Sequence, residues 1–117
     1  VSPDAFFEQQ VILNYCPLAF MADSGRNVTP DKTPRAMRDL IISRCDSHMA
    51  RVLELLSPAY VVGIGAFATA RLSAAVNLVS SLQPAVVRIL HPSPASPAAN
   101  KDWAGTATRQ LIEAGVW

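Results

Sequence analysis

The stretch that decides the fold is YVVGIGAFATARLSAAVNLVSSLQPAVVRILH, residues 60–91. Its two ends, residues 60–64 and 85–90, are short runs of β-branched and apolar side chains, which favour buried strands. Between them, Gly63 and Gly65 form a tight turn into an Ala- and Leu-rich segment, residues 67–81, which predicts a helix. A strand, a helix and a second strand in this order indicate parallel strands joined by a right-handed crossover. The stretch therefore predicts an α/β fold.

The flanking sequence adds a helix on each side and one more strand. Thr33 and Pro34 resemble a capping residue followed by proline in the first turn, and predict a helix that ends at Ser57-Pro58. Its buried face is expected to contain apolar residues at helical spacing: Met37, Leu40, Ile41, Cys45, Met49, Val52, Leu53 and Leu56. Residues 11–13 predict a first strand, and residues 22–33 and 92–98 predict loops. A last helix is expected to bury Trp103, Ala107, Leu111 and Ala114 and to stop at Gly115.

These elements predict one domain over residues 1–117, an α/β three-layer sandwich around a short central parallel sheet. The chain starts at Val1 instead of Met, which suggests a piece of a longer protein. Half of its 117 residues are hydrophobic and 16% are charged, which excludes intrinsic disorder.

Composition also limits the partners and the compartment. No apolar run approaches the length of a membrane span, so no membrane partner is expected. Cys16 and Cys45 do not form a disulfide framework, and no Cys/His cluster has zinc-ligand spacing. We therefore expect no metal, and a reducing compartment, the cytosol or the nucleus. No acidic residue occurs between Glu54 and Asp102. This is compatible with an anionic ligand, or with a segment that is mostly buried and simply excludes charge.

The predicted strand ends carry the candidate site residues, because ligands of such sheets bind beyond the carboxyl ends of the strands. Asn14 follows the first strand, and its amide can pair with the edge of a base or tie its own backbone into a turn. His91 follows the last strand, and it can donate a hydrogen bond to charge developing on a substrate oxygen or be satisfied within the fold. His48 is expected to be an ordinary residue of an amphipathic helix.

Two further features leave alternatives open. Gly63, Gly65 and Ala68 have the spacing of a dinucleotide-binding turn, but the acidic residue expected about twenty positions later is absent. A Rossmann-type nucleotide-binding module and a non-catalytic interaction domain therefore remain alternative interpretations. The loop residues Ser24, Gly25, Arg26 and Asn27, and Asn100-Lys101, suit phosphate contacts beside the same sheet edge, or are ordinary solvated loop residues.

Five segments taken together resemble one family. They are NYCPL (residues 14–18), SGRNVTP (24–30), VVGIG (61–65), LHPSP (90–94) and ANK (99–101). In order and spacing they resemble the single-strand-selective monofunctional uracil-DNA glycosylases, members of the uracil-DNA glycosylase superfamily. The resemblance runs nearly from Val1 to Trp117 and corresponds to the C-terminal half of such an enzyme.

The resemblance implies a nuclear, monomeric base-excision repair enzyme without a cofactor. Such an enzyme flips uracil, or an oxidised uracil such as 5-hydroxymethyluracil, out of DNA and hydrolyses its N-glycosidic bond. By the family's pattern, Asn14 reads the uracil edge and His91 hydrogen-bonds the uracil O2 during bond cleavage. The segment that wedges into DNA corresponds to the loop from Pro92 to Lys101. The residues expected to contact DNA are Pro92, Ser93, Pro94, Ala95, Ser96, Pro97, Asn100 and Lys101, together with Ser24 and Arg26.

The sequence departs from the family's pattern in two places. The Gly-Met-Asn-Pro-Gly motif, whose Asn positions the attacking water, has no counterpart in these residues, so we expect the 117-residue chain alone to have little or no activity. The wedge loop has Ala95 where the family often has arginine, which suggests weaker penetration of duplex DNA.

Overall fold

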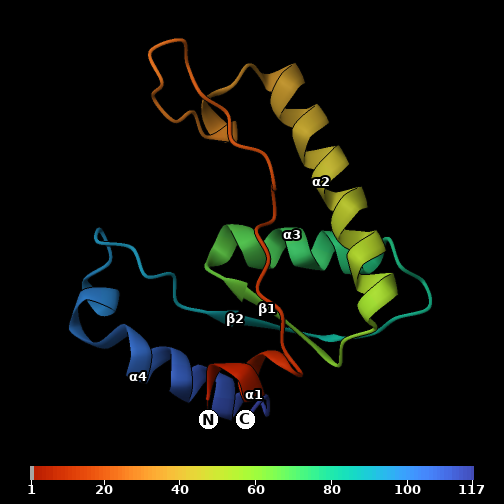
Figure 1. Ribbon diagram of the computed structural model, residues 1–117, viewed down its shortest axis with the longest axis vertical. Coiled ribbons are helices and arrows are strands. Elements are labelled where there is room, and N and C mark those ends of the chain that lie inside the picture. Colours follow the sequence, from red (N-terminus) through yellow and green to blue (C-terminus); the bar gives the residue numbers. More distant parts are fainter. Residues whose placement is uncertain (1) are drawn as a thin grey trace.

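The computed structural model describes residues 2–117 and is a small α/β structure (Figure 1). Its helices and strands are α1 (Pro3–Phe7), the 3-10 helix η1 (Pro30–Lys32), α2 (Arg35–Leu56), β1 (Tyr60–Ile64), α3 (Ala66–Asn77), β2 (Ala85–Ile89) and α4 (Pro97–Glu113). β1 and β2 form a two-stranded parallel sheet, in register from Tyr60 opposite Ala85 to Ile64 opposite Ile89. The prediction of an α/β fold with a short parallel sheet is confirmed.

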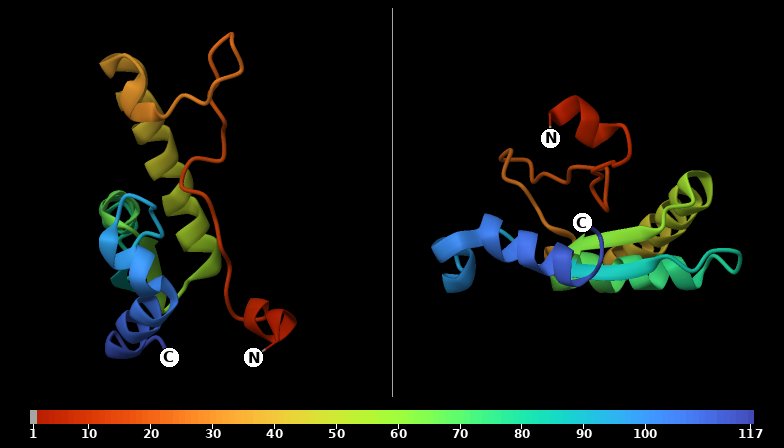
Figure 2. Two further views of the ribbon diagram at one scale, coloured as in Figure 1. Left: turned by 90° about the vertical axis from the view of Figure 1, so that its left-hand side faces the viewer. Right: turned by 90° about the horizontal axis from the view of Figure 1, so that it is seen from below.

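Helices cover both faces of this sheet, because neighbouring residues of a strand point to opposite sides. One apolar cluster joins β1 to α2 and α3 and contains Met49, Leu53, Val61 and Ala75. The other joins β2 to α4 and contains Ile89, Ala107 and Leu111, with Val62 and Trp103 packed against it. The layers are therefore α2 and α3, the sheet, and α4 (Figures 1 and 2).

The packing is tight at the centre and open at the periphery. Gly63 lies so close to α3 that a Cβ atom there would collide with Thr69, so this glycine permits the close approach of helix and strand. By contrast, only the C-terminal half of α2 is buried, and Met37 and Leu40 near its start are more than half exposed. The radius of gyration is 15.8 Å, against about 13 Å for a compact domain of this length. The chain therefore leaves much apolar surface open.

The structure corrects several details of the sequence prediction. Residues 11–13 form no strand; they are extended, and Ile12 is 67% exposed because no neighbouring strand lies beside them in the described chain. Thr33 does not cap α2, because its hydroxyl donates to the carbonyl of Pro30 at 2.6 Å. The helix predicted over 67–81 ends at Asn77, and α4 begins at Pro97, inside the expected loop.

At the two ends of the chain, one helix was missed by the sequence analysis and one predicted helix end is confirmed. The short helix α1 was not predicted. The predicted stop of the last helix is confirmed, because Gly115 has a positive φ of 74°. None of the helices within residues 2–117 is both long and apolar enough to cross a membrane.

Candidate functional site

His91 lies against the turn that follows β1. Gly65 in this turn has a φ of 92°, and its N–H donates to the carbonyl of Ile89 at 2.9 Å. A Cβ atom on Gly65 would lie 3.0 Å from the Cβ of His91. The two glycines that suggested a dinucleotide-binding turn therefore have packing roles: Gly63 admits α3, and Gly65 admits His91.

The backbone leading into His91 is held by two side chains of α4. The N–H of Leu90 donates to the Oε1 atom of Gln110 at 2.8 Å, and the Nε1 atom of Trp103 donates to the carbonyl of Leu90 at 2.5 Å. The imidazole of His91 is exposed and makes no hydrogen bond within residues 2–117. The strand end is thus fixed while the ring remains available to a ligand.

Asn14 is also exposed, and its carboxamide has no hydrogen-bond partner in the described part of the chain. The turn-forming role considered for this side chain is therefore not observed. Its neighbour Tyr15 is anchored instead: the hydroxyl lies 2.6 Å from Oδ1 of Asp46 and 3.1 Å from the carbonyl oxygen of Ile42, both on α2.

Contacts through the start of α3 connect the surroundings of Asn14 and His91. The ring of Tyr15 packs edge-on against Phe67, with ring centroids 5.6 Å apart. Phe67 is two residues after Gly65, which adjoins His91. The residue next to Asn14 therefore contacts the first turn of α3, and His91 adjoins Gly65 just before that turn. The described chain shows no hydrogen bond between the Asn14 and His91 side chains.

Burial and charge act on the groups beneath Asn14. Burial raises the pKa of Tyr15 well above its ordinary value, and the hydrogen bond to Asp46 raises it further. Asp46 also pairs with Arg71 of α3 at 3.0 Å, and both side chains are largely buried. Burial, followed by the nearby Cys16 thiol, raises the pKa of Cys45 to about 11. These groups are held protonated or paired, and they form a structural support.

The loop after His91 is stiffened by its own hydrogen bonds. The N–H of Ser93 donates to the His91 carbonyl at 2.8 Å, and the N–H of Ser96 donates to the Ser93 carbonyl at 2.9 Å. The side chain of Asn100 donates to the Pro94 carbonyl at 2.8 Å. Predicted as a DNA contact, Asn100 thus holds the loop together. The exposed predicted contacts of this segment are Pro92, Pro94, Ala95, Pro97, Asn100 and Lys101, and Ser93 and Ser96 are partly buried.

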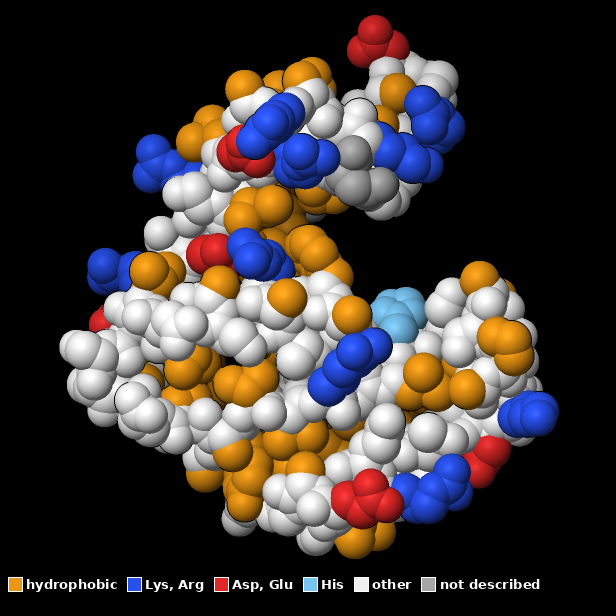
Figure 3. All heavy atoms as spheres, turned by 180° about the vertical axis from the view of Figure 1, so that it is seen from behind, with side chains coloured by type: hydrophobic (Ala, Val, Ile, Leu, Met, Phe, Trp, Pro, Cys, Tyr) orange, Lys and Arg blue, Asp and Glu red, His pale blue; other side chains and the backbone are white. Residues whose placement is uncertain are grey.

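The other predicted contact loop lies elsewhere. Ser24 and Arg26 are at the tip of a small hairpin that is closed by the Met21–Asn27 bridge. This hairpin lies near the start of α2, away from the sheet and from the 92–101 loop in both views (Figures 1 and 2). The expectation that both loops share one sheet edge is therefore wrong. Figure 3 shows the resulting notch, with Lys and Arg side chains on the arm above it and a histidine at its lower rim.

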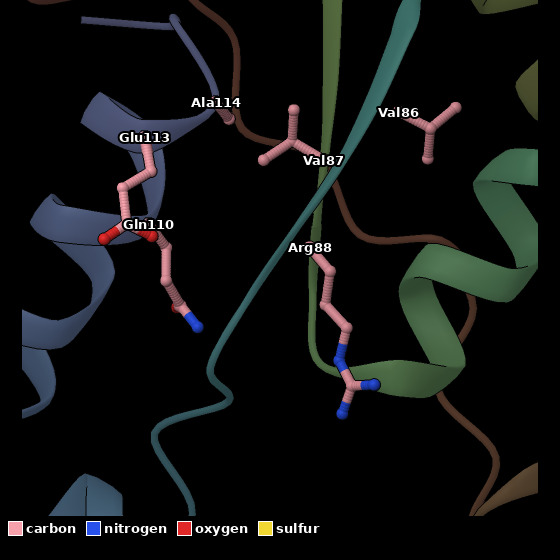
Figure 4. Close-up of a pocket in the computed structure, with 6 residues that line it drawn as sticks. All are labelled: Val86, Val87, Arg88, Gln110, Glu113 and Ala114. Carbon is pink, nitrogen blue, oxygen red and sulfur yellow. The ribbon is translucent and has the colours of Figure 1, made fainter.

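The cavities lie outside this region. A hollow of about 380 Å³ between β2 and α4 is lined by Val86, Val87, Arg88, Gln110, Glu113 and Ala114 (Figure 4). A second, of similar volume, lies between α1 and Trp117. Neither is lined by Asn14 or His91. Among the side chains that the structure describes, no three of His, Cys, Asp or Glu are grouped closely enough to hold a metal ion.

Comparison with known proteins finds no matching family model. The chain is 40% identical over 116 residues to a bovine single-strand selective monofunctional uracil DNA glycosylase, covering 97% of this chain and 42% of that protein. Rat and mouse proteins described in the same words are 42% and 41% identical over 115 residues, covering 97% of this chain and 41% and 40% of those proteins. The resemblance expected from the motifs is confirmed, and the chain spans about two fifths of the length of these relatives.

Proposed function

We propose that this chain is part of the catalytic domain of a DNA glycosylase that releases uracil, or an oxidised uracil such as 5-hydroxymethyluracil, in base-excision repair. The observation that carries the proposal is the pair of free polar side chains, Asn14 and His91. His91 follows β2 at the carboxyl end of the sheet, and Tyr15, the neighbour of Asn14, contacts the first turn of α3. Relatives that are 40–42% identical over nearly the whole chain are uracil-DNA glycosylases by name.

The chemistry of these two side chains suits the reaction. Extracting a base from the stack costs a few kcal/mol, and the flipped base is then recognised at its edge. The carboxamide of Asn14 both donates and accepts hydrogen bonds, which matches the adjacent carbonyl and N–H of uracil. Cleavage of the glycosidic bond leaves a cationic, oxocarbenium-like sugar and an anionic base. A hydrogen bond from an imidazole N–H of His91 to the uracil O2 stabilises that anion as it forms.

The loop from Pro92 to Lys101 is the proposed DNA-wedging segment. Its internal hydrogen bonds set its shape before DNA arrives, which lowers the entropic cost of binding. Lys101 and, on the separate hairpin, Ser24 and Arg26 supply polar and basic groups for phosphates. Ala95 is too short to fill the space left by a flipped base, so we expect weaker engagement of duplex than of single-stranded DNA.

We further propose that residues 1–117 form the C-terminal portion of one larger catalytic domain. β1 is paired only with β2 within the described residues, and the apolar side chains Val11, Ile12, Leu13 and Leu18 are each more than half exposed. The remaining part of the domain would cover these surfaces and supply the residue that positions water. The whole protein would act on uracil-containing DNA as a monomer in the nucleus.

The test is single-turnover release of uracil from a single-stranded oligonucleotide by the full-length protein. We expect Asn14→Ala and His91→Ala each to lower the rate by about 10²–10³-fold, the usual effect of removing one such hydrogen bond. His48→Ala and Asn77→Ala are matched controls, because both residues are exposed helix positions outside the site. An unchanged rate in both site variants, or DNA binding without release by the wild type, would overturn the proposal.

A further inference from the structure

The segment that carries Asn14 is attached to the rest of the described chain through the side chains that follow Asn14, above all that of Tyr15. Residues 10–19 include no helix or strand. The Cys16 thiol bonds to the nearby Leu18 carbonyl and also lies beside the Cys45 thiol of α2. Among these ten residues, the side-chain hydrogen bonds to another element are those of Tyr15. A segment held by so few side chains can shift when one of them is lost, so the position of Asn14 depends on its immediate neighbour, Tyr15.

That anchor, which we call the Tyr15 clasp, consists of Tyr15, Ile42, Asp46, Phe67 and Arg71. The hydroxyl of Tyr15 donates to the Asp46 carboxylate on α2 at 2.6 Å and lies 3.1 Å from the Ile42 carbonyl oxygen, while its ring packs on Phe67 at the start of α3. The carboxylate accepts the hydroxyl on Oδ1 and the guanidinium of Arg71 on Oδ2. Each clasp residue is thereby fixed by at least one other.

The charges of the clasp make this anchor stronger than an ordinary tyrosine contact. A hydrogen bond to an ionised carboxylate is about twice as strong as one between neutral groups. Arg71 pairs with Asp46 and fixes its orientation, so the carboxylate meets the Tyr15 hydroxyl in one geometry. The ion pair of the clasp also joins α2 to α3. α3 begins directly after Gly65, the residue that packs against His91.

We propose that Tyr15 is a positioning residue: its hydroxyl, held by Asp46 and Arg71, sets the distance and orientation of the Asn14 carboxamide relative to His91. The inference rests on the proposed function of Asn14. Tyr15 itself does not touch the base. Without the Tyr15 hydroxyl, the Asn14 carboxamide would have no fixed position from which to bind a flipped base. Small displacements of such groups slow enzyme reactions strongly.

The experiment compares Tyr15→Phe with Tyr60→Phe in the full-length protein. Tyr15→Phe keeps the ring on Phe67 and removes only the hydroxyl, whereas the Tyr60 hydroxyl makes no hydrogen bond within residues 2–117. We expect Tyr15→Phe to slow single-turnover uracil release at least about 10-fold and Tyr60→Phe to change it less than about 2-fold. Affinity for DNA with an abasic site should stay within about 2-fold for both, because no base is left for Asn14 to read.

A double variant separates positioning from general structural support. If Tyr15 acts through Asn14, then Asn14→Ala/Tyr15→Phe should release uracil as slowly as Asn14→Ala alone, since residues that act as a unit are not additive. Asp46→Asn retains an oxygen for the Tyr15 hydroxyl but loses the ion pair with Arg71, so we expect a loss smaller than that of Tyr15→Phe. Melting temperatures confirm that each variant is folded under the assay conditions.

The outcomes distinguish the two proposals. Absence of uracil release by the wild-type protein overturns the proposed function. With an active wild type, a Tyr15→Phe rate within 2-fold of normal overturns the positioning role. So does a further loss of rate when Tyr15→Phe is added to Asn14→Ala, or a matching loss of affinity for abasic DNA.

Discussion

Replacing Gly65 by alanine tests how the turn after β1 supports His91. Gly65 has a φ of 92° and a ψ of 171°, a combination that L-residues with a side chain rarely adopt. Alanine there costs about 1–3 kcal/mol in the free energy of unfolding. The new methyl group would also lie 3.0 Å from the Cβ and 3.4 Å from the Cδ2 of His91. The imidazole must therefore move by a few tenths of an ångström or more, away from its position above the sheet.

The two effects of Gly65→Ala have separate magnitudes. The backbone term lowers stability, but a protein with several kcal/mol in reserve stays folded at 25 °C. In the proposed reaction, displacement of the imidazole would weaken the hydrogen bond from His91 to the uracil O2, and a misplacement of about 1 Å can cost about 100-fold in rate. For a smaller movement we expect about a 10-fold loss of uracil release per folded molecule.

Gly25→Ala is the matched control. Gly25 also has a positive φ, 79°, but a Cβ atom there would meet nothing within 4 Å. Urea denaturation of the full-length variants gives the stability change, and single-turnover uracil release under folded conditions gives the rate. Both variants should be destabilised, and only Gly65→Ala should be slow. Equal rates for the two variants would refute the idea that the turn positions His91.

Three further predictions concern packing, thiol chemistry and completeness. Leu53→Ala should lower the free energy of unfolding by about 2–5 kcal/mol, because Leu53 is 4% exposed and packs in the cluster between β1 and α2. Leu55 is 85% exposed, so Leu55→Ala should change the free energy of unfolding by less than about 0.5 kcal/mol in the same urea titration. Cys45 should resist iodoacetamide at pH 8 while the less buried Cys16 is modified, and Cys45 labelling should rise as the pH approaches its pKa of about 11. Mass spectrometry of the labelled peptides measures both reactions, and faster labelling of Cys45 than of Cys16 at pH 8 would contradict this prediction. Since that pKa is raised from an ordinary 9.0, its contribution to stability is present below pH 9 and is lost as pH rises towards 11. The 117-residue chain alone should release little or no uracil in an assay where the full-length protein is active, and robust release by the isolated chain would contradict the account of a missing water-positioning residue.

Local patterns in the sequence predicted the centre of the fold. The buried face of α2 could be read from the helical spacing of Cys45, Met49 and Leu53, and the strands from their β-branched residues. Both patterns are local, so no knowledge of residues distant in sequence was needed. Residues 11–13 have the same β-branched character but form no strand, because pairing requires a neighbour that residues 2–117 do not provide. The first half of α2 was predicted to bury Met37 and Leu40 for the same local reason, and both remain exposed.

Sequence motifs identified the candidate site residues but not what holds them. Nothing in the order of residues indicated that Asp46 and Arg71, which lie on different helices, would meet each other and Tyr15. Likewise, Gln110 and Trp103 read as helix residues, but both bond the backbone of Leu90. These supports are contacts between elements distant in sequence, and their pairing depends on how α2, α3 and α4 pack on the sheet.

The two supports follow the same physical logic. Asn14 and His91 must keep their polar atoms unpaired if they are to bind a base, so neither can be fixed by its own hydrogen bonds. Each is fixed instead through the adjacent residue, Asn14 through the side chain of Tyr15 and His91 through the backbone of Leu90. In a site built this way the side chains are held in position, but their hydrogen-bonding atoms stay free for the substrate. Preorganised groups of this kind can bind a transition state more strongly than the ground state. It also means that conservative changes at Tyr15 or Gln110 should alter the rate of uracil release more than they alter the affinity for DNA.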